Sequence, residues 1–300
     1  MATILIAGLI NIETTLAIDG FPINYAPVRY PFFGVNSTVS GVGYNLAKAL
    51  TRLGHTVRFL ALIGNDAAGL LVRQALATDS IDASAVLDGL THTPQSVILY
   101  DRDGKRMLYT DLKNIQELAY PSERFAELLT GCDLAVLCNI NFARPFLAHT
   151  RARGVPIATD VHAIANLEDA YNSDYMAYAD LLFQSHELLP CSPSEWLDRL
   201  KARYNPRLAV IGMGGKGALL GGYAMGEPYH CPAVVTRPIK STVGAGDALC
   251  AGFIDGWLRG YAPEAALQRA TLFASYKIGS IGAAEGFLGV AELERLWRGE

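Results

Sequence analysis

Short, nearly continuous apolar runs alternate along this chain with stretches of helical periodicity. Uniformly apolar runs of this length are typical of strands in a parallel sheet that is buried on both faces. The expected strands cover residues 3–8, 56–63, 133–138, 155–159, 181–183 and 208–211. The alternation predicts an open α/β sheet that binds ligands at the carboxyl ends of its strands.

The segments between these runs predict helices. Residues 45–53 repeat apolar side chains every three or four positions, and Gly54 then ends the pattern. Residues 69–77 show the same spacing. Past the last strands, three more helices are expected, over residues 244–260, 263–279 and 290–297.

Composition narrows the class of protein further. The 300 residues are 51% hydrophobic and 18% charged, so the chain is expected to fold around a large core. A net charge of −4 argues against nucleic acid as a partner. The apolar runs are shorter than the roughly 20 residues that cross a bilayer, so no membrane span is expected. The start has no basic segment before its apolar run, which predicts a first strand and a cytoplasmic protein.

Two segments interrupt the alternation. Residues 19–40 contain three prolines and several aromatics, which excludes a helix and predicts a loop or extended stretches. Residues 96–110 predict a hairpin around Asp103 and Gly104. The two segments are expected to pair as a small sheet that forms a lid over a polar substrate. A hairpin without such a role is the alternative.

The most informative segment for chemistry is residues 240–253, in which Gly244, Ala245 and Gly246 open a helix and Asp247 follows. Backbone amides converge at a helix N-terminus, and small residues there let a phosphate approach them. An aspartate in that turn is placed to take the proton of an attacking hydroxyl. The alternative is that Asp247 only stabilises the first turn of the helix.

The sequence TVGAGDALCAGF at residues 242–253 resembles the carboxyl-terminal signature of the PfkB, or ribokinase-like, family of carbohydrate kinases. SGVGYN at residues 40–45 resembles the amino-terminal signature, and further matches extend over nearly the whole chain. The resemblance implies one domain over residues 1–300, a ribokinase-like three-layer α/β/α sandwich with a small β-rich lid inserted at about residues 12–40 and 96–110. It also implies a homodimer formed through the lid.

The resemblance assigns roles to individual positions. Asp247 matches the catalytic base, and Gly244, Ala245 and Gly246 match the anion hole for the transferred phosphoryl group. The positions that match sugar-binding residues are Asn11, Glu13, Gly41 and Asn45. As alternatives, Asn11 would cap a turn and Asn45 its helix.

ATP and Mg²⁺ are the implied cofactors. The positions expected to bind the nucleotide are Ser185, Gly214, Lys216, Gly217 and Thr242. A plain tight turn is the alternative for the glycines. The family's N-x-x-E motif is missing, since Ser185 and Leu188 stand at its two positions. Glu187 is the candidate magnesium-supporting residue, with a solvated helix-start glutamate as the alternative.

Ser241 stands where many members have an aspartate that helps to bind a monovalent cation, so weak dependence on potassium is expected. Lys240 beside it is expected to point to solvent rather than to supply the missing charge. The same S-T-V-G-A-G-D form resembles the branch that phosphorylates sugar phosphates. Four basic residues of the predicted lid are candidates to bind such a phosphate, although solvent-facing charge is the default: Arg29, Arg102, Lys105 and Arg106.

The sequence thus predicts an ATP-dependent kinase that phosphorylates a hydroxyl of a sugar or sugar-like molecule. A nucleoside kinase of the adenosine or pseudouridine type is an alternative, because aromatics of the lid such as Tyr25 and Phe32 are suited to stack on a base. A sugar-phosphate kinase is another. The non-enzyme alternative is a sugar- or nucleotide-binding regulator with the same fold.

Overall fold

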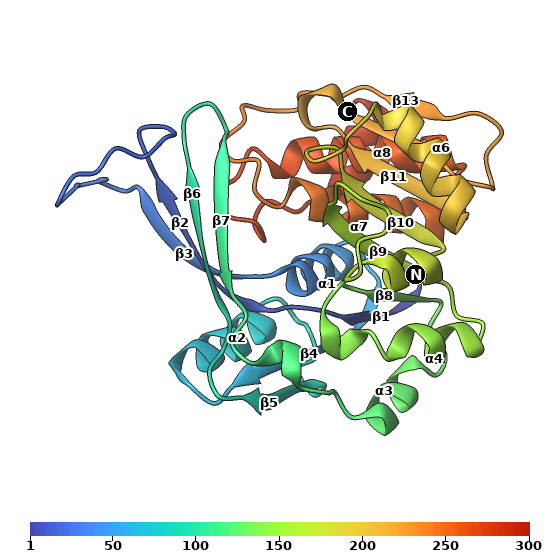
Figure 1. Cartoon of the computed structure of the whole chain (residues 1–300), viewed down its shortest axis with the longest axis horizontal. Helices are drawn as coiled ribbons and strands as arrows, with labels where there is room; N and C mark the ends of the chain where they lie inside the picture. The colour runs from blue at the N-terminus through green and yellow to red at the C-terminus, as the bar shows by residue number, and fades with distance from the viewer.

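The computed structural model describes residues 1–300 and contains a nine-stranded sheet in the order β13-β12-β11-β10-β9-β8-β1-β4-β5 (Figure 1). All neighbouring strands between β11 and β5 in this order pair in parallel. Strand β12 pairs antiparallel with both β11 and β13. The strands are β1 (Thr3–Ala7), β4 (Thr56–Gly64), β5 (Val86–Leu90), β8 (Leu134–Leu137), β9 (Ile157–Ala163), β10 (Leu181–Ser185), β11 (Leu208–Gly212), β12 (Ala218–Gly221) and β13 (Tyr229–Cys231).

Helices cover both faces of this sheet. Alternate residues of β1 pack into opposite cores, with Ile4 and Ile6 on one side and Leu5 and Ala7 on the other. The first core is closed by α1 (Val42–Arg52), α2 (Ala67–Thr78), α7 (Ala245–Leu258), α8 (Pro263–Lys277) and α9 (Val290–Arg298). The second is closed by α3 (Ser122–Leu129), α4 (Phe146–Ala152), α5 (Ser173–Tyr178) and α6 (Pro193–Tyr204). The result is the expected three-layer α/β fold.

None of these helices combines the length and the apolar composition needed to cross a membrane.

A second sheet of four strands, in the order β3-β2-β6-β7, stands beside the main body (Figure 1). Its strands are β2 (Asn11–Ala17), β3 (Val35–Ser40), β6 (Gln95–Tyr100) and β7 (Arg106–Asp111). The parallel pairing of β2 with β6 joins the two segments that interrupt the α/β alternation. We call this second sheet the lid. It is rooted near the main sheet because only three residues separate β1 from β2.

The expected hairpin is present, but its connection differs from a two-residue turn. Residues 101–105 form the loop between β6 and β7, and Gly104 adopts a φ of 79°. Asp101 closes the loop because its carboxylate accepts hydrogen bonds from the amides of Asp103 and Lys105. The Asp-Gly pair therefore indicated the turn correctly, whereas the side chain of Asp101 sets its length.

Candidate active site

The N-terminus of α7 lies at the centre of the candidate site. Gly244 precedes the helix with a φ of 76°, and Asp247 lies in its first turn. The backbone amides of Gly244, Gly246 and Asp247 donate to no acceptor in the protein. These amides and the helix dipole favour an anion at this point.

The two glycines of this loop are required for different reasons. A β-carbon on Gly244 would lie 2.4 Å from the carbonyl oxygen of Ala283, and the positive φ is itself unfavourable for other residues. A β-carbon on Gly246 would meet no atom within 4 Å. Close packing therefore requires a glycine at position 244. At Gly246, the absence of a side chain instead leaves open space beside the free amides.

A chain of hydrogen bonds leads from Asp247 to the root of the lid. The side-chain amide of Asn45 donates to Asp247 at 2.6 Å. The hydroxyl of Ser40 lies 3.3 Å from the side-chain oxygen of Asn45 and 3.1 Å from the carboxylate of Glu13. Asn11 donates to the hydroxyl of Ser96 on β6 at 2.8 Å. Four predicted residues thus lie together at the lid root: Asn11, Glu13, Asn45 and Asp247.

Some of these buried polar atoms have no partner in the protein. One side-chain oxygen of Asn11 and one of Glu13 are buried and accept no hydrogen bond. Buried acceptors without partners are costly, so atoms of this kind are candidates to meet the hydroxyls of a ligand. At Gly41, a β-carbon would lie 2.6 Å from the carbonyl oxygen of Leu9. This glycine is explained by the close packing of the turn that precedes α1.

Burial raises the pKa of Asp247, and the nearby carboxylate of Asp160 raises it further. The hydrogen bond from Asn45 opposes this shift. Burial likewise raises the pKa of Glu13, against the hydrogen bond from Ser40. A carboxylate whose pKa is raised towards the working pH is better suited to accept a proton during a reaction.

The lid contacts the anion-binding loop through Arg106, which donates to the carbonyl of Thr242 at 3.1 Å. The same guanidinium lies 3.6 Å from the carboxylate of Glu187. Ile98 of the lid packs with Val243 and Ala283 in a small buried cluster. The lid therefore reaches the loop in this structure, and Arg106 is the one of the four basic lid residues that does so by a hydrogen bond. Arg29 instead pairs with Asp19 in the loop between β2 and β3.

The residues predicted to bind a nucleotide lie on adjacent strand ends. Ser185 ends β10 and pairs with Gly212 at the end of β11. Gly214 and Lys216 lie in the short 3-10 helix that follows. A β-carbon on Gly217 would lie 2.0 Å from the carbonyl oxygen of Cys231, so close packing requires this glycine. Lys216 is exposed, and its carbonyl is paired with His230 at 2.8 Å.

Glu187 lies at the edge of the site with an exposed carboxylate. Its pairing with Arg106 brings it beside the loop that holds Thr242. Nowhere do three or more His, Cys, Asp or Glu residues gather in a way that would hold a metal ion. An exposed carboxylate of this kind fits a hydrated Mg²⁺ that is bound mainly by phosphates, since Mg²⁺ keeps several waters as ligands.

Sequence patterns did not indicate three polar residues of the site. Ser40 and Ser96 lie on lid strands; Ser40 begins the SGVGYN segment but was assigned no role, and nothing in the spacing of Ser96 marks it. Lys277 is fully buried at the end of α8. A signal for Lys277 exists, because it follows Ala270 and Phe273 on the apolar face of its helix.

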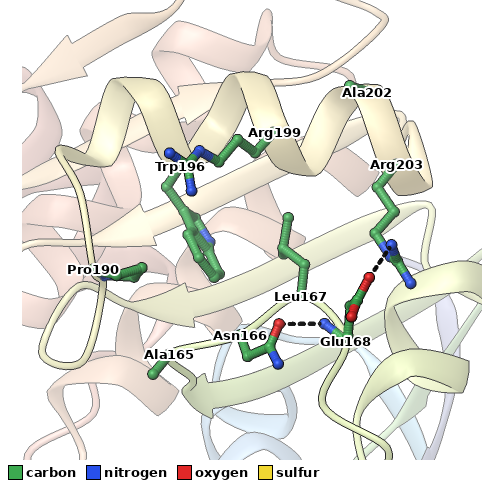
Figure 2. Close-up of a pocket in the computed structure, with 9 residues that line it drawn as sticks. All are labelled: Ala165, Asn166, Leu167, Glu168, Pro190, Trp196, Arg199, Ala202 and Arg203. Carbon is green, nitrogen blue, oxygen red and sulfur yellow. Dashed lines mark hydrogen bonds and ion pairs between the residues drawn. The ribbon is translucent and has the colours of Figure 1, made fainter.

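A cavity of about 570 Å³ lies elsewhere, between the loop that follows β9 and helix α6 (Figure 2). The ion pair of Glu168 and Arg203 borders it, and the indole of Trp196 points into the same region (Figure 2). None of the residues predicted to bind substrate or nucleotide lines this cavity. The candidate site is the group of residues around Asp247 instead.

The chain is similar to known proteins over most of its length. The model of the pfkB family carbohydrate kinases matches residues 1–288. The fructosamine kinase FrlD of Bacillus subtilis is 27% identical over 250 residues, which cover 81% of this chain and 84% of that protein. The ATP-dependent ribose-1-phosphate kinase of Halopiger xanaduensis is 27% identical over 290 residues, 94% of each chain. The solved structure of the microbiome-derived acarbose kinase Mak1 shares the fold, with a TM-score of 0.87, 22% identity and 99% coverage of both chains.

The contrast between the two loop glycines can be tested by unfolding in urea. Gly244→Ala should lower the free energy of unfolding by at least ~1 kcal/mol, because alanine must adopt a positive φ against the Ala283 carbonyl. Gly246→Ala should leave the free energy of unfolding unchanged or raise it by up to ~1 kcal/mol, since alanine favours helix. Similar losses in both variants would contradict the distinction.

Proposed function

Because the chain belongs to the pfkB family of carbohydrate kinases, we propose that it transfers the γ-phosphoryl group of ATP to a hydroxyl of a sugar or sugar-like acceptor. The observation that carries this proposal is the position of Asp247. Its carboxylate has a raised pKa and lies in the same helical turn as the free amides of Gly244 and Gly246. A base beside an anion-binding loop is the arrangement that phosphoryl transfer to an alcohol requires.

In the proposed reaction, Asp247 takes the proton of the acceptor hydroxyl. The hydroxyl oxygen forms a bond to the γ-phosphorus, and the bond from that phosphorus to the β–γ bridging oxygen breaks to release ADP. Asn45 holds Asp247 in place through its 2.6 Å hydrogen bond. The free amides of the α7 loop donate to the phosphoryl oxygens as negative charge develops on them.

ATP and Mg²⁺ are the proposed cofactors. The strand ends around Ser185 and Gly214, together with Thr242, form the nucleotide side of the site. Magnesium would neutralise charge on the phosphates, and Glu187 is placed to accept hydrogen bonds from its waters. Because the reaction consumes ATP, we also infer a cytoplasmic location.

The polar groups at the lid root favour a hydroxyl-rich acceptor. Asn11 and Glu13 each keep a buried oxygen without a partner, and such acceptors suit sugar hydroxyls. The aromatic rings expected to stack on a nucleoside base are exposed in the loop between β2 and β3, including Tyr25 and Phe32. We therefore favour a sugar over a nucleoside as the acceptor. A phosphorylated sugar is a second candidate because Arg106 reaches the site from the lid.

An assay of ADP formation across free sugars, sugar phosphates and nucleosides identifies the acceptor class. With the best acceptor, Asp247→Asn should lower turnover by ~10²-fold or more, because the variant cannot take the proton. Near-normal turnover in this variant would contradict the role of Asp247.

Asp247→Asn should also change how the free energy of unfolding depends on pH. Burial raises the pKa of Asp247 in the folded protein above its value in the unfolded chain. The fold therefore loses stability as the pH rises through the raised pKa, and the charged carboxylate destabilises the fold at pH 7. Asp247→Asn should therefore unfold at pH 7 with a free energy no lower than that of the wild type. The difference between the two proteins should shrink as the pH falls towards ~4. A less stable variant would show that its lost activity reports misfolding.

Arg106 is proposed to hold the lid closed over the phosphates. Arg106→Ala should raise the KM for the acceptor and increase hydrolysis of ATP without acceptor, because a loosened lid admits water. Arg124→Ala removes a surface arginine from α3 and serves as the control. An unchanged acceptor KM and unchanged ATP hydrolysis in Arg106→Ala would show that this arginine does not hold the lid closed.

We further propose that two copies of the chain pair through their lids. The lid and the loop between β2 and β3 expose a set of apolar side chains that includes Tyr25, Tyr30, Phe32, Phe33, Val97, Leu108 and Tyr109. Exposed apolar surface of this extent is typical of an interaction site.

Phe33→Asp should convert the dimer to a monomer in sedimentation velocity experiments. Phe33 is fully exposed and has a φ of 57°, a conformation that aspartate tolerates, so the folded monomer should keep its stability. Val235→Asp changes an exposed apolar residue outside the lid and should sediment like the wild type. A wild-type chain that sediments as a monomer at micromolar concentration would exclude the dimer.

A further inference from the structure

Lys277, the last residue of α8, is fully buried and takes no part in the proton transfer described above. Its ammonium donates to two main-chain carbonyls, that of Val243 and, at 2.7 Å, that of Gly282. No carboxylate lies within ion-pair distance of it. A buried charge held only by neutral groups is costly to the fold, which indicates a role other than stability.

The two carbonyls belong to the segments that build the anion-binding loop. The carbonyl of Val243 is part of the same peptide group as the amide of Gly244, which donates to no acceptor in the protein. A positive charge on the carbonyl polarises this peptide group and makes its N–H a stronger donor. The carbonyl of Gly282 precedes Ala283, against which Gly244 packs. Lys277 therefore both joins the two segments and strengthens a donor of the candidate anion site.

Charged groups around Lys277 support a protonated side chain. The pKa of Lys277 is lowered to about 8, mainly by burial, against the opposing effect of Asp247, Glu13 and Glu285 and together with a smaller lowering by Arg106. A pKa near 8 leaves most of the population charged at pH 7. Lys277 is the only side chain that donates to these two carbonyls, and Lys240 on the same loop is exposed.

We propose that Lys277 is a positioning residue that acts as a built-in cation of the anion-binding loop, holding the Val243 and Gly282 carbonyls and polarising the Gly244 amide. Two converging carbonyl oxygens also suit a free monovalent cation. The fixed ammonium makes such an ion unnecessary, so the wild-type protein needs no soluble cation at this position. The link to catalysis rests on the proposed kinase function.

Chemical rescue of Lys277→Ala tests the proposal. With tetramethylammonium as the only monovalent cation, the variant should lose ~10²-fold in kcat, with little change in the KM for the acceptor. Ammonium, methylammonium or potassium at constant ionic strength should restore at least ~10-fold of that loss, because a small cation can enter the space left by the side chain. The wild type should change less than about threefold across the same salts.

Lys277→Met separates charge from packing. It fills the same space without a charge, so it should fold at least as stably as the wild type, remain slow and respond to no cation. Lys240→Ala removes an exposed lysine next to the same loop and should match the wild type in every salt. A folded Lys277→Met variant with normal kcat would overturn the proposal. A slow Lys277→Ala variant that no cation rescues would do the same.

Binding of inorganic phosphate, measured by calorimetry, tests the loop without turnover. Lys277→Met should bind phosphate at least ~10-fold more weakly than the wild type, and Lys240→Ala should bind it equally well. This result would support the built-in cation even if no sugar served as acceptor. Equal phosphate affinity in a folded Lys277→Met variant would overturn it even if the kinase assay succeeded.

Discussion

The close approach of backbone at the end of β1 determines where the polar residues of the site lie. A β-carbon on Gly8 would lie 2.7 Å from the α-carbon of Gly43, so the start of α1 packs directly on the chain that leaves the first strand. This contact brings Asn45 of α1 next to the root of the lid, where Glu13 lies. A larger residue at either glycine would separate the two segments. The hydrogen-bonded chain from Glu13 to Asp247 depends on their contact.

The site contains several buried ionisable groups, and burying them destabilises the fold. The packing of the two apolar cores must offset this loss of stability. Asp247 and Glu13 are carboxylates whose pKa values are raised by burial, and Lys277 is a buried ammonium without an ion pair. Each group destabilises the fold in its charged form, and each is placed where charge would move or develop in the proposed reaction. This trade of stability for activity is typical of catalytic sites.

The strands around the site and the anion-binding loop could be predicted from sequence because their patterns are local. Uniform apolar composition identified the parallel strands, and the small residues before Asp247 identified the start of α7. Helices α3 to α6 were not identified, because α3, α4 and α5 have only six to eight residues and half of the 12 residues of α6 are polar or charged. Lys277 was missed because a lysine at a helix end is normally assigned to solvent. Its position on the apolar face of α8 was an available signal, and tertiary packing shows that its surroundings are closed.

The construction of the lid links acceptor occupancy to lid position. Asn11 and Glu13 lie on β2 and Ser96 on β6, so the side chains proposed to hold the acceptor belong to the lid itself. Any outward rotation about the three residues between β1 and β2 would carry these groups away from Asp247. Binding of an acceptor therefore favours the closed lid, and closing the lid raises the affinity for the acceptor by the same factor. An acceptor that bound only to the main body would lack this reciprocity.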